Sequence, residues 1–352
     1  MKKHQLFIAL VMALCLSVAF VSVASAQDAT LMGRTSLDDR GQSLDENLDE
    51  EADKEEKSWG VAADLTFDLG VGAFVKNKYA RRVRSKFGFE ASGYYKIPVI
   101  DTNIELATGF TAWMSKAGGS NGVHEFRWTD SYIGFSRELY SYKGELLRFM
   151  LNAGLGFAIP TSKASWTTNL YTSIMPQLGM GLKIARFGVF YAVRYSHNFN
   201  KYTSASVDPN EVDALSRSAG NELLSRTDIA IAGVLTEIEL VNAFSLSYDI
   251  LDELVLSVGF AFADFWTYDS ESLNDDDYTN PNAKPGRGHG QMSAGSVALA
   301  YTPWRYTTIT FFLKSEQPWK QKDNKELRFP WFDTISYSKN YTKFGVTATF
   351  RY

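Results

Sequence analysis

The sequence predicts an all-β fold, namely a transmembrane antiparallel β-barrel of about twelve strands. Three observations lead to this fold class. The chain begins with an export signal, it has no later run of the roughly 18 apolar residues that a spanning helix requires, and from Trp59 onward it divides into segments of about ten alternating residues. A soluble exported protein is the alternative, but an aromatic content of 14% together with frequent glycine favours the barrel.

An amino-terminal signal peptide is predicted over residues 1–26. Lys2 and Lys3 form a positive start, an apolar run follows, and Ala24-Ser25-Ala26 supplies the small residues that signal peptidase accepts. The single cysteine, Cys15, lies within this signal. The mature chain is therefore expected to have neither a disulfide nor a thiolate metal site.

Residues 27–57 form an acidic leader, with eleven Asp/Glu against four Lys/Arg, a net charge of −7 and no aromatic residue. A segment of this composition cannot bury enough apolar surface to order itself, so we predict a disordered periplasmic leader. A flexible plug and a partner-binding tail are the alternatives. The barrel is expected to occupy residues 58–352, whose charges nearly balance.

The predicted strands are recognised by period-two alternation. Between Trp59 and Gly70 one face carries apolar residues and the other carries Asp, Thr and Gly, and the segments 148–157 and 254–263 repeat the pattern. Five short turns alternate with six longer polar stretches, which gives twelve strands with short periplasmic turns and long extracellular loops. The turns are placed at Pro98–Asp101, Tyr142–Gly144, Ala185–Gly188, Leu251–Glu253 and Thr302–Arg305, and the loops at Val75–Lys86, Lys116–Arg127, Thr161–Tyr171, Phe199–Thr227, Asp269–Gly290 and Gln317–Phe332.

Aromatic residues cluster near the predicted strand ends. Rings that are apolar in body and polar at the tip suit the headgroup zone, so these residues predict two girdles around the barrel. An ordinary aromatic core is the alternative. The residues are Tyr94, Tyr95, Trp113, Tyr191, Tyr195, Trp266, Tyr268, Tyr301, Trp304 and Trp331.

The last predicted strand shows the alternation most clearly. Counting back from Tyr352, Phe350 and Phe344 fall on the lipid face, whereas Arg351 and Lys343 fall on the lumen face. A final strand that ends in Phe-x-Tyr resembles the insertion signal of bacterial outer-membrane barrels. The resemblance covers the final strand alone. It implies a location in the outer membrane and recognition of that strand by the barrel assembly machinery.

Residues that could carry catalysis or bind a metal do not form a convincing site, so no enzyme, cofactor or metal is predicted. Outer-membrane phospholipase barrels place a catalytic His and Ser two residues apart on a strand, but here Ser196 and His197 are adjacent and would face opposite sides of the sheet. His124 and His289 fall in predicted loops without metal-ligand spacing. The run Asn274–Asp277 is a weak candidate for a divalent cation, with a solvated acidic loop as the alternative.

A basic run near the first predicted outer loop is a candidate for binding lipopolysaccharide. Arginine and lysine bind phosphate groups well, and the outer leaflet presents them in lipopolysaccharide. A generic solvated loop is the alternative, and nucleic acid is not an expected partner. The candidate residues are Lys76, Lys78, Arg81, Arg82, Arg84 and Lys86.

The lumen face of the predicted strands combines many small residues with charges of both signs. Small linings favour a water-filled passage, and opposed charges can set a transverse field across it. The sequence therefore predicts a narrow channel for passive passage of small hydrophilic solutes. The alternative is a structural, adhesion or assembly barrel that acts through its loops. The pore-lining candidates are Asp64, Asp68, Glu90, Glu105, Arg148, Lys183, Arg194, Glu237, Glu239, Lys314, Lys343 and Arg351.

Overall fold

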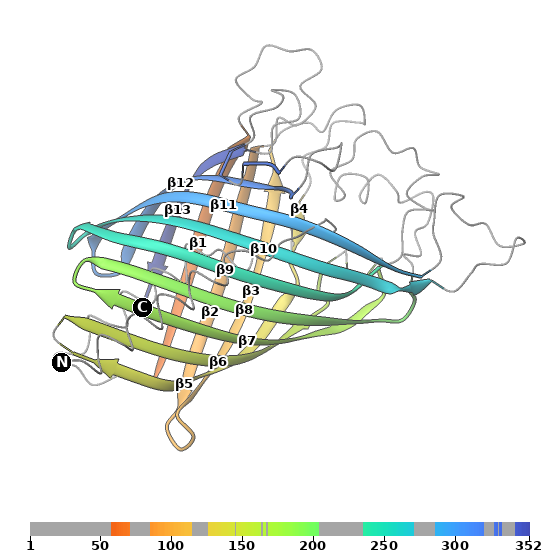
Figure 1. Cartoon of the computed structure of the whole chain (residues 1–352), viewed down its shortest axis with the longest axis horizontal. Helices are drawn as coiled ribbons and strands as arrows, with labels where there is room; N and C mark the ends of the chain where they lie inside the picture. The colour runs from red at the N-terminus through yellow and green to blue at the C-terminus, as the bar shows by residue number, and fades with distance from the viewer. Residues whose placement is uncertain are drawn as a thin grey trace, which may run out of the picture.

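Antiparallel strands close on themselves to form a barrel in the computed structural model of the chain (Figure 1). Among the residues that the structure describes, no helix is long and apolar enough to cross a bilayer. The described residues are 58–70, 85–114, 126–144, 146–162, 165–166, 168–203, 235–270, 286–319, 327–329, 331–332 and 342–352.

The strands follow one another around the barrel in the order of the sequence, apart from the place of the short strand β4. Their bounds are β1 Trp59–Gly70, β2 Ser85–Ile97, β3 Thr102–Trp113, β4 Phe126–Trp128, β5 Ser131–Lys143, β6 Leu147–Ile159, β7 Leu170–Ile184, β8 Phe187–Asn200, β9 Thr236–Leu251, β10 Leu254–Ser270, β11 Gly286–Trp304, β12 Thr307–Pro318 and β13 Thr342–Arg351.

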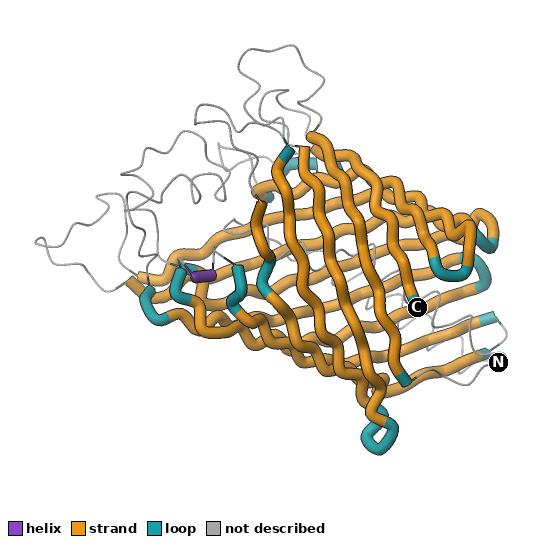
Figure 2. Tube along the Cα trace, turned by 180° about the vertical axis from the view of Figure 1, so that it is seen from behind, coloured by secondary structure: helices purple, strands orange, loops and turns teal. Residues whose placement is uncertain are grey.

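The prediction of twelve barrel strands is confirmed. Both β4 and β5 pair with β3, at Phe110–Ala112 and Asn103–Ala107 respectively, so the two short ladders together make one position in the wall. The barrel closes where β1 pairs with β13, with Asp64 opposite Thr349. Figure 2 shows this closed wall from behind, with the carboxyl terminus at the end of the last strand.

Each of the five short turns overlaps its predicted range, although Phe187, Gly188 and residues 302–304 belong to strands. The six longer connections lie at the opposite end of the barrel. One predicted loop is shorter than expected. The stretch Asp269–Gly290 was predicted to be a loop, but β10 continues to Ser270 and β11 begins at Gly286. The sequence Gly-Arg-Gly-His-Gly at 286–290 carries no hydrophobic alternation, so the pattern of the sequence did not indicate a strand there.

The two faces of the wall differ as predicted. On β1 and β13 the outward side chains Phe67 and Phe350 are 38% and 44% exposed, whereas inward Asp68 and Thr349 are 4% and 3% exposed. The registers of all neighbouring ladders continue the same alternation. The outer surface is thus an apolar band, as expected for a wall in contact with lipid.

The prediction of an outward girdle is wrong for Tyr94. Adjacent residues on a strand point to opposite faces, so Tyr95 faces outward and Tyr94 faces the lumen, where its ring covers Gly60. Tyr191 faces outward and donates a hydrogen bond, 2.8 Å long, to Oδ1 of Asn242 on β9. This bond satisfies a polar side chain that otherwise faces lipid.

A small polar area interrupts the outer wall on β11 and β12. The outward side chains Ser293, Ser315 and Gln317 are fully buried. Trp319 and Trp331 cover this area by packing against the rings of Phe260 and Phe262. The covering segment is anchored by the indole N–H of Trp331, which donates to the carbonyl of Gly259 at 3.0 Å, and by the amide of Gln317, which donates to the carbonyl of Phe329.

Candidate functional site

The inner wall of the barrel is the candidate functional site, because it brings together the charged residues that the sequence singled out. Ladder registers place eleven of the twelve predicted pore-lining residues on this face. The twelfth, Glu237, lies at an irregularity of the β9–β10 ladder near the extracellular end, where Arg287 of β11 pairs with it. Within the described ranges, no three His, Cys, Asp or Glu side chains converge on a possible metal site.

Large aromatic side chains lie directly over glycines of the inner wall. A Cβ atom at Gly134 or Gly156 would come within 2.6 or 2.5 Å of the ring of Tyr132, and one at Gly345 would come within 2.5 Å of the ring of Phe312. These rings therefore lie along the wall, over the strands. The inner surface was predicted to be lined by small residues, but part of it is lined by rings that lie over glycines. These rings lie against the wall and not along the barrel axis.

A buried ion pair lies midway along the wall. Nη2 of Arg194 on β8 is 3.5 Å from Oε2 of Glu239 on β9, and both side chains are about nine-tenths buried. Gln177 of β7 is directly opposite Arg194, and its side chain covers Gly154. The pair fixes one positive and one negative charge side by side on the inner surface.

Towards the extracellular end, three lysines gather with two carboxylates on β1, β2, β12 and β13. Lys86 lies directly opposite Asp68, and Lys314 lies directly opposite Lys343. Nζ of Lys343 is 3.6 Å from Oε2 of Glu316. Lys86 thus belongs to the inner wall. The other five residues of that predicted cluster lie outside the described residues.

Two carboxylates lie opposite each other on β1 and β2, further towards the periplasmic end than this group. Asp64 of β1 is directly opposite Glu90 of β2. The hydroxyl of Thr349 on β13 donates a hydrogen bond, 2.5 Å long, to Oδ1 of Asp64. This hydrogen bond supports the charge of Asp64 from the side of the barrel seam, where β1 meets β13.

At the periplasmic end, three cations lie side by side on β5, β6 and β7. Lys143 is directly opposite Arg148, and Arg148 is directly opposite Lys183. We call these three residues the basic row. Nζ of Lys183 is also 3.1 Å from Oδ2 of Asp249 on β9. The sequence singled out Arg148 and Lys183 but missed Lys143, because it is the last residue of its strand and was assigned to the turn.

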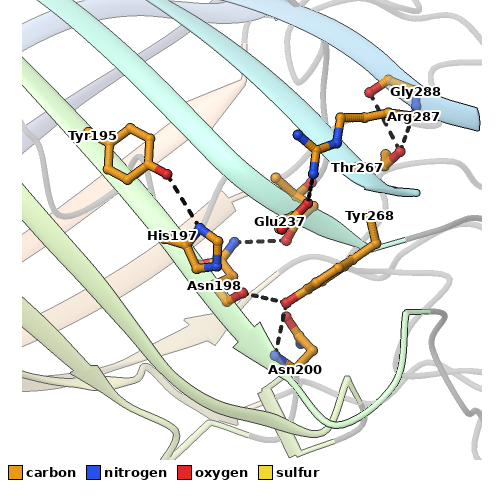
Figure 3. Close-up of polar contacts among 10 residues, drawn as sticks. Tyr195, His197, Asn198, Asn200, Glu237, Thr267, Tyr268, Arg287 and Gly288 are labelled. Atoms are coloured by element: carbon orange, nitrogen blue, oxygen red, sulfur yellow. Dashed lines mark hydrogen bonds and ion pairs between the residues drawn. The ribbon is translucent and has the colours of Figure 1, made fainter.

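The extracellular rim is held by a hydrogen-bond network over the start of β9 (Figure 3). The hydroxyl of Tyr268 on β10 donates to the carbonyl of Asn198 and accepts from the N–H of Asn200 at 3.1 Å. The side-chain amide of Asn198 donates to the carbonyl of Thr236 at 3.0 Å. Tyr268 therefore connects β10 to β8 across the end of the strand between them.

His197 and His289, the histidines that the structure describes, lie on the outward face. His197 points away from Ser196, as predicted, because Ser196 pairs with inward Glu239 and His197 pairs with outward Ile238. His289 was predicted to be in a loop but lies in β11, where its Nε2 is 3.1 Å from Oδ1 of Asp264. His124 and the run Asn274–Asp277 lie outside the described residues.

Comparison with known proteins gives likeness of fold without likeness of sequence. No family model matches the chain, and no curated protein matches it. Among solved structures, it is similar to an outer-membrane channel from Pseudomonas putida F1 (9% identity, TM-score 0.49, 86% of this chain and 100% of that chain). It is also similar to the KdgM porin (8%, 0.36, 82% and 98%) and to outer membrane phospholipase A from Escherichia coli (12%, 0.36, 88% and 98%).

The chain is a closed, antiparallel β-barrel of twelve strand positions. Its wall is closed, so no strand edge is left along the seam between β1 and β13. Its outward face is apolar and its inward face is charged, which suits a wall with lipid outside and a polar interior.

Proposed function

We propose that the barrel is a narrow channel for the passive passage of small hydrophilic solutes. The observation that carries this proposal is the inner wall, which presents charges of both signs from the periplasmic to the extracellular end. The basic row lies at one end, the Arg194–Glu239 pair lies between the ends, and the Lys86–Asp68 pair of opposed residues lies towards the other. A surface of this kind favours water and polar solutes over apolar ones.

The large inward side chains support a passage along the axis. Because Tyr132 and Phe312 lie over glycines, their bulk is placed against the wall. Fixed charges of both signs on such a wall let a solute exchange its hydration for wall contacts without being held strongly at one place. Passive passage requires this balance between entry and release.

Single-channel recording in planar bilayers tests the proposal. We expect discrete conductance steps, and we expect them to shrink when Ala192, an inward residue of β8, is replaced by tryptophan. The neighbouring replacement Val193→Trp places the same bulk on the outward face and serves as the matched control. Folding of both variants is checked by the shift in mobility between heated and unheated samples in gel electrophoresis.

Two results would count against a channel. One is a folded wild-type protein that gives no conductance at any voltage or salt concentration. The other is an equal effect of Ala192→Trp and Val193→Trp, because the current would then not pass through the lumen. Either result would favour a barrel that acts through its loops.

A further inference from the structure

The apolar band of the outer wall is shorter on β11 and β12 than on the neighbouring strand β10. Towards the extracellular end, the last outward apolar side chains of β11 and β12 are Val297 and Leu313, which lie directly opposite each other. From Tyr301, near the periplasmic end of β11, to Val297 the strand covers roughly 10 Å of membrane at a tilt of about 40°. A membrane barrel needs an apolar band about 25 Å tall. The extracellular half of this band is therefore missing from the two strands themselves.

Polar side chains occupy the outward positions where the band is missing. Ser293 of β11 lies directly opposite both Phe262 of β10 and Gln317 of β12. At the level where β10 presents a phenylalanine, β11 and β12 thus present a hydroxyl and an amide. Ser293 and Gln317 are nevertheless fully buried, whereas Phe311, nearer the periplasmic end of β12, is 57% exposed. The chain itself therefore covers this part of the wall.

Five residues that follow β12 form this covering layer, which we call the cover. They are Trp319, Leu327, Phe329, Trp331 and Phe332. The ring centroid of Trp319 is 4.5 Å from that of Phe262, and the ring centroid of Trp331 is 5.7 Å from that of Phe260. The other three side chains of the cover are 56%, 46% and 42% exposed in the order of the sequence. The cover thus packs two rings against the wall and presents further apolar surface away from it.

We propose that the cover lies within the membrane, where the acyl chains of the extracellular leaflet contact Leu327, Phe329 and Phe332. Phe262 is eight residues beyond Leu254, the first residue of β10, which places it roughly 20 Å from the periplasmic edge of the band. This level is still inside an apolar band of about 25 Å. The exposed side chains of the cover therefore complete the band over β11 and β12.

Backbone groups of the covering segment are bonded as a lipid environment requires. Lipid offers no hydrogen-bond partner, so polar groups within it must be satisfied by the protein. The carbonyl of Trp319 accepts from the N–H of Arg328 at 2.9 Å, and the carbonyl of Phe329 accepts from the side-chain amide of Gln317. The indole N–H of Trp331 donates to the carbonyl of Gly259 at 3.0 Å. These bonds fix the cover to the outside of the wall, whether or not solutes pass through the lumen.

Fluorescence quenching at single labelled cysteines measures contact with lipid in the full mature chain, refolded into phosphatidylcholine vesicles. Cys15 lies in the predicted signal, so Leu327→Cys and Phe332→Cys each give one site for a nitrobenzoxadiazole label. Phe311→Cys, on the outward wall, is the lipid control. Tyr202→Cys, exposed just beyond the extracellular end of β8, is the water control. The two quenchers are nitroxide-labelled acyl chains and aqueous Co²⁺, and the gel mobility shift confirms folding.

The nitroxide lipid should quench both cover labels within about twofold of the label at 311 and at least about threefold more than the label at 202. Aqueous Co²⁺ should quench the label at 202 alone. Cover labels that Co²⁺ quenches and lipid does not would overturn the proposal. Protection from both quenchers would also overturn it, because a second copy of the chain would then cover these side chains. A label at 311 that lipid leaves unquenched would refute the membrane contact of the whole wall.

The unsubstituted chain provides a second measurement, because a cysteine in the cover could itself disturb the packing. A diazirine carried on an acyl chain attaches on illumination to the residues that it contacts. We expect it on the tryptic peptide 329–339, which contains three residues of the cover, and not on the peptide 202–217. Attachment to the wall peptide 306–314 without attachment to 329–339 would overturn the proposal. A folded barrel that gives no conductance would refute the channel and leave these results intact.

Discussion

The guanidinium of Arg194 lies 3.5 Å from the carboxylate of Glu239 on the inner wall, with side-chain exposures of 9% and 11%. Because both side chains are nearly buried, each charge is compensated mainly by the charge of its partner and not by water. Removing one partner leaves an uncompensated charge, whereas removing both leaves none. This asymmetry gives the first prediction.

Arg194→Leu and Glu239→Gln should each destabilise the folded barrel by about 3 kcal/mol, and the double variant should lose less than the sum. The measurement is urea unfolding in lipid vesicles, followed by tryptophan fluorescence. Additive losses would show that the two side chains do not interact across the wall.

A charged side chain on the outward face should destabilise the folded barrel more near the middle of the membrane than near its edge. Phe311 on β12 is outward and 57% exposed, and Phe311→Arg should destabilise the barrel by about 2–4 kcal/mol. Tyr306, in the turn before β12, provides the comparison, because Tyr306→Arg should cost about 1 kcal/mol or less. Equal costs in vesicle unfolding would mean that Phe311 does not lie in the hydrocarbon.

Two inward glycines should respond differently to alanine. A Cβ at Gly345 would come within 2.3 Å of the carbonyl oxygen of Phe67, so the backbone of the β1–β13 seam must move, at a cost of about 1–3 kcal/mol. At Gly88 the nearest atom, Cβ of Thr66, is 3.8 Å away, and Gly88→Ala should stabilise the strand by up to about 1 kcal/mol. Unfolding midpoints that move together would contradict this register.

The rim network should be weakened by removing one hydroxyl. Tyr268→Phe deletes the bonds to Asn198 and Asn200 and keeps the ring (Figure 3), so local stability at the end of β8 should fall by about 1 kcal/mol. The measurement is hydrogen exchange at the backbone amide of Asn200. Tyr248→Phe, an outward tyrosine at the periplasmic end of β9, should leave that amide unaffected.

Most of the wall could be predicted because each strand repeats one physical rule. The final strand from Lys343 to Arg351 alternates between lipid and lumen so regularly that its register follows from the sequence. Predictions were wrong where that rule has no apolar face to act on. Arg287 and His289 lie in a part of β11 that has no apolar alternation. Tyr94 was grouped with Tyr95 by residue type, although adjacent residues on a strand face opposite sides.

The candidate site was harder to predict because it depends on which strand ends meet. Lys143, Arg148 and Lys183 are far apart in the pattern of the sequence, and the cross-strand registers bring them into one row. Lys86 was assigned to a surface cluster because its charged neighbours in the sequence are basic. Its partner across the ladder is Asp68, which no local pattern indicates.

The seam between β1 and β13 also constrains how the chain can fold. Val61 and Tyr352 exchange two backbone hydrogen bonds of 3.0 and 2.9 Å, and Asp64 bonds to Thr349 across 285 positions of the chain. Closing a loop of that length costs about 5 kcal/mol in entropy beyond a constant term, before the seam contributes anything. Such non-local pairing makes folding intrinsically slow, and every intermediate exposes two unpaired strand edges. The first and last strands are therefore expected to pair late in folding, after the strands between them have formed their local hairpins.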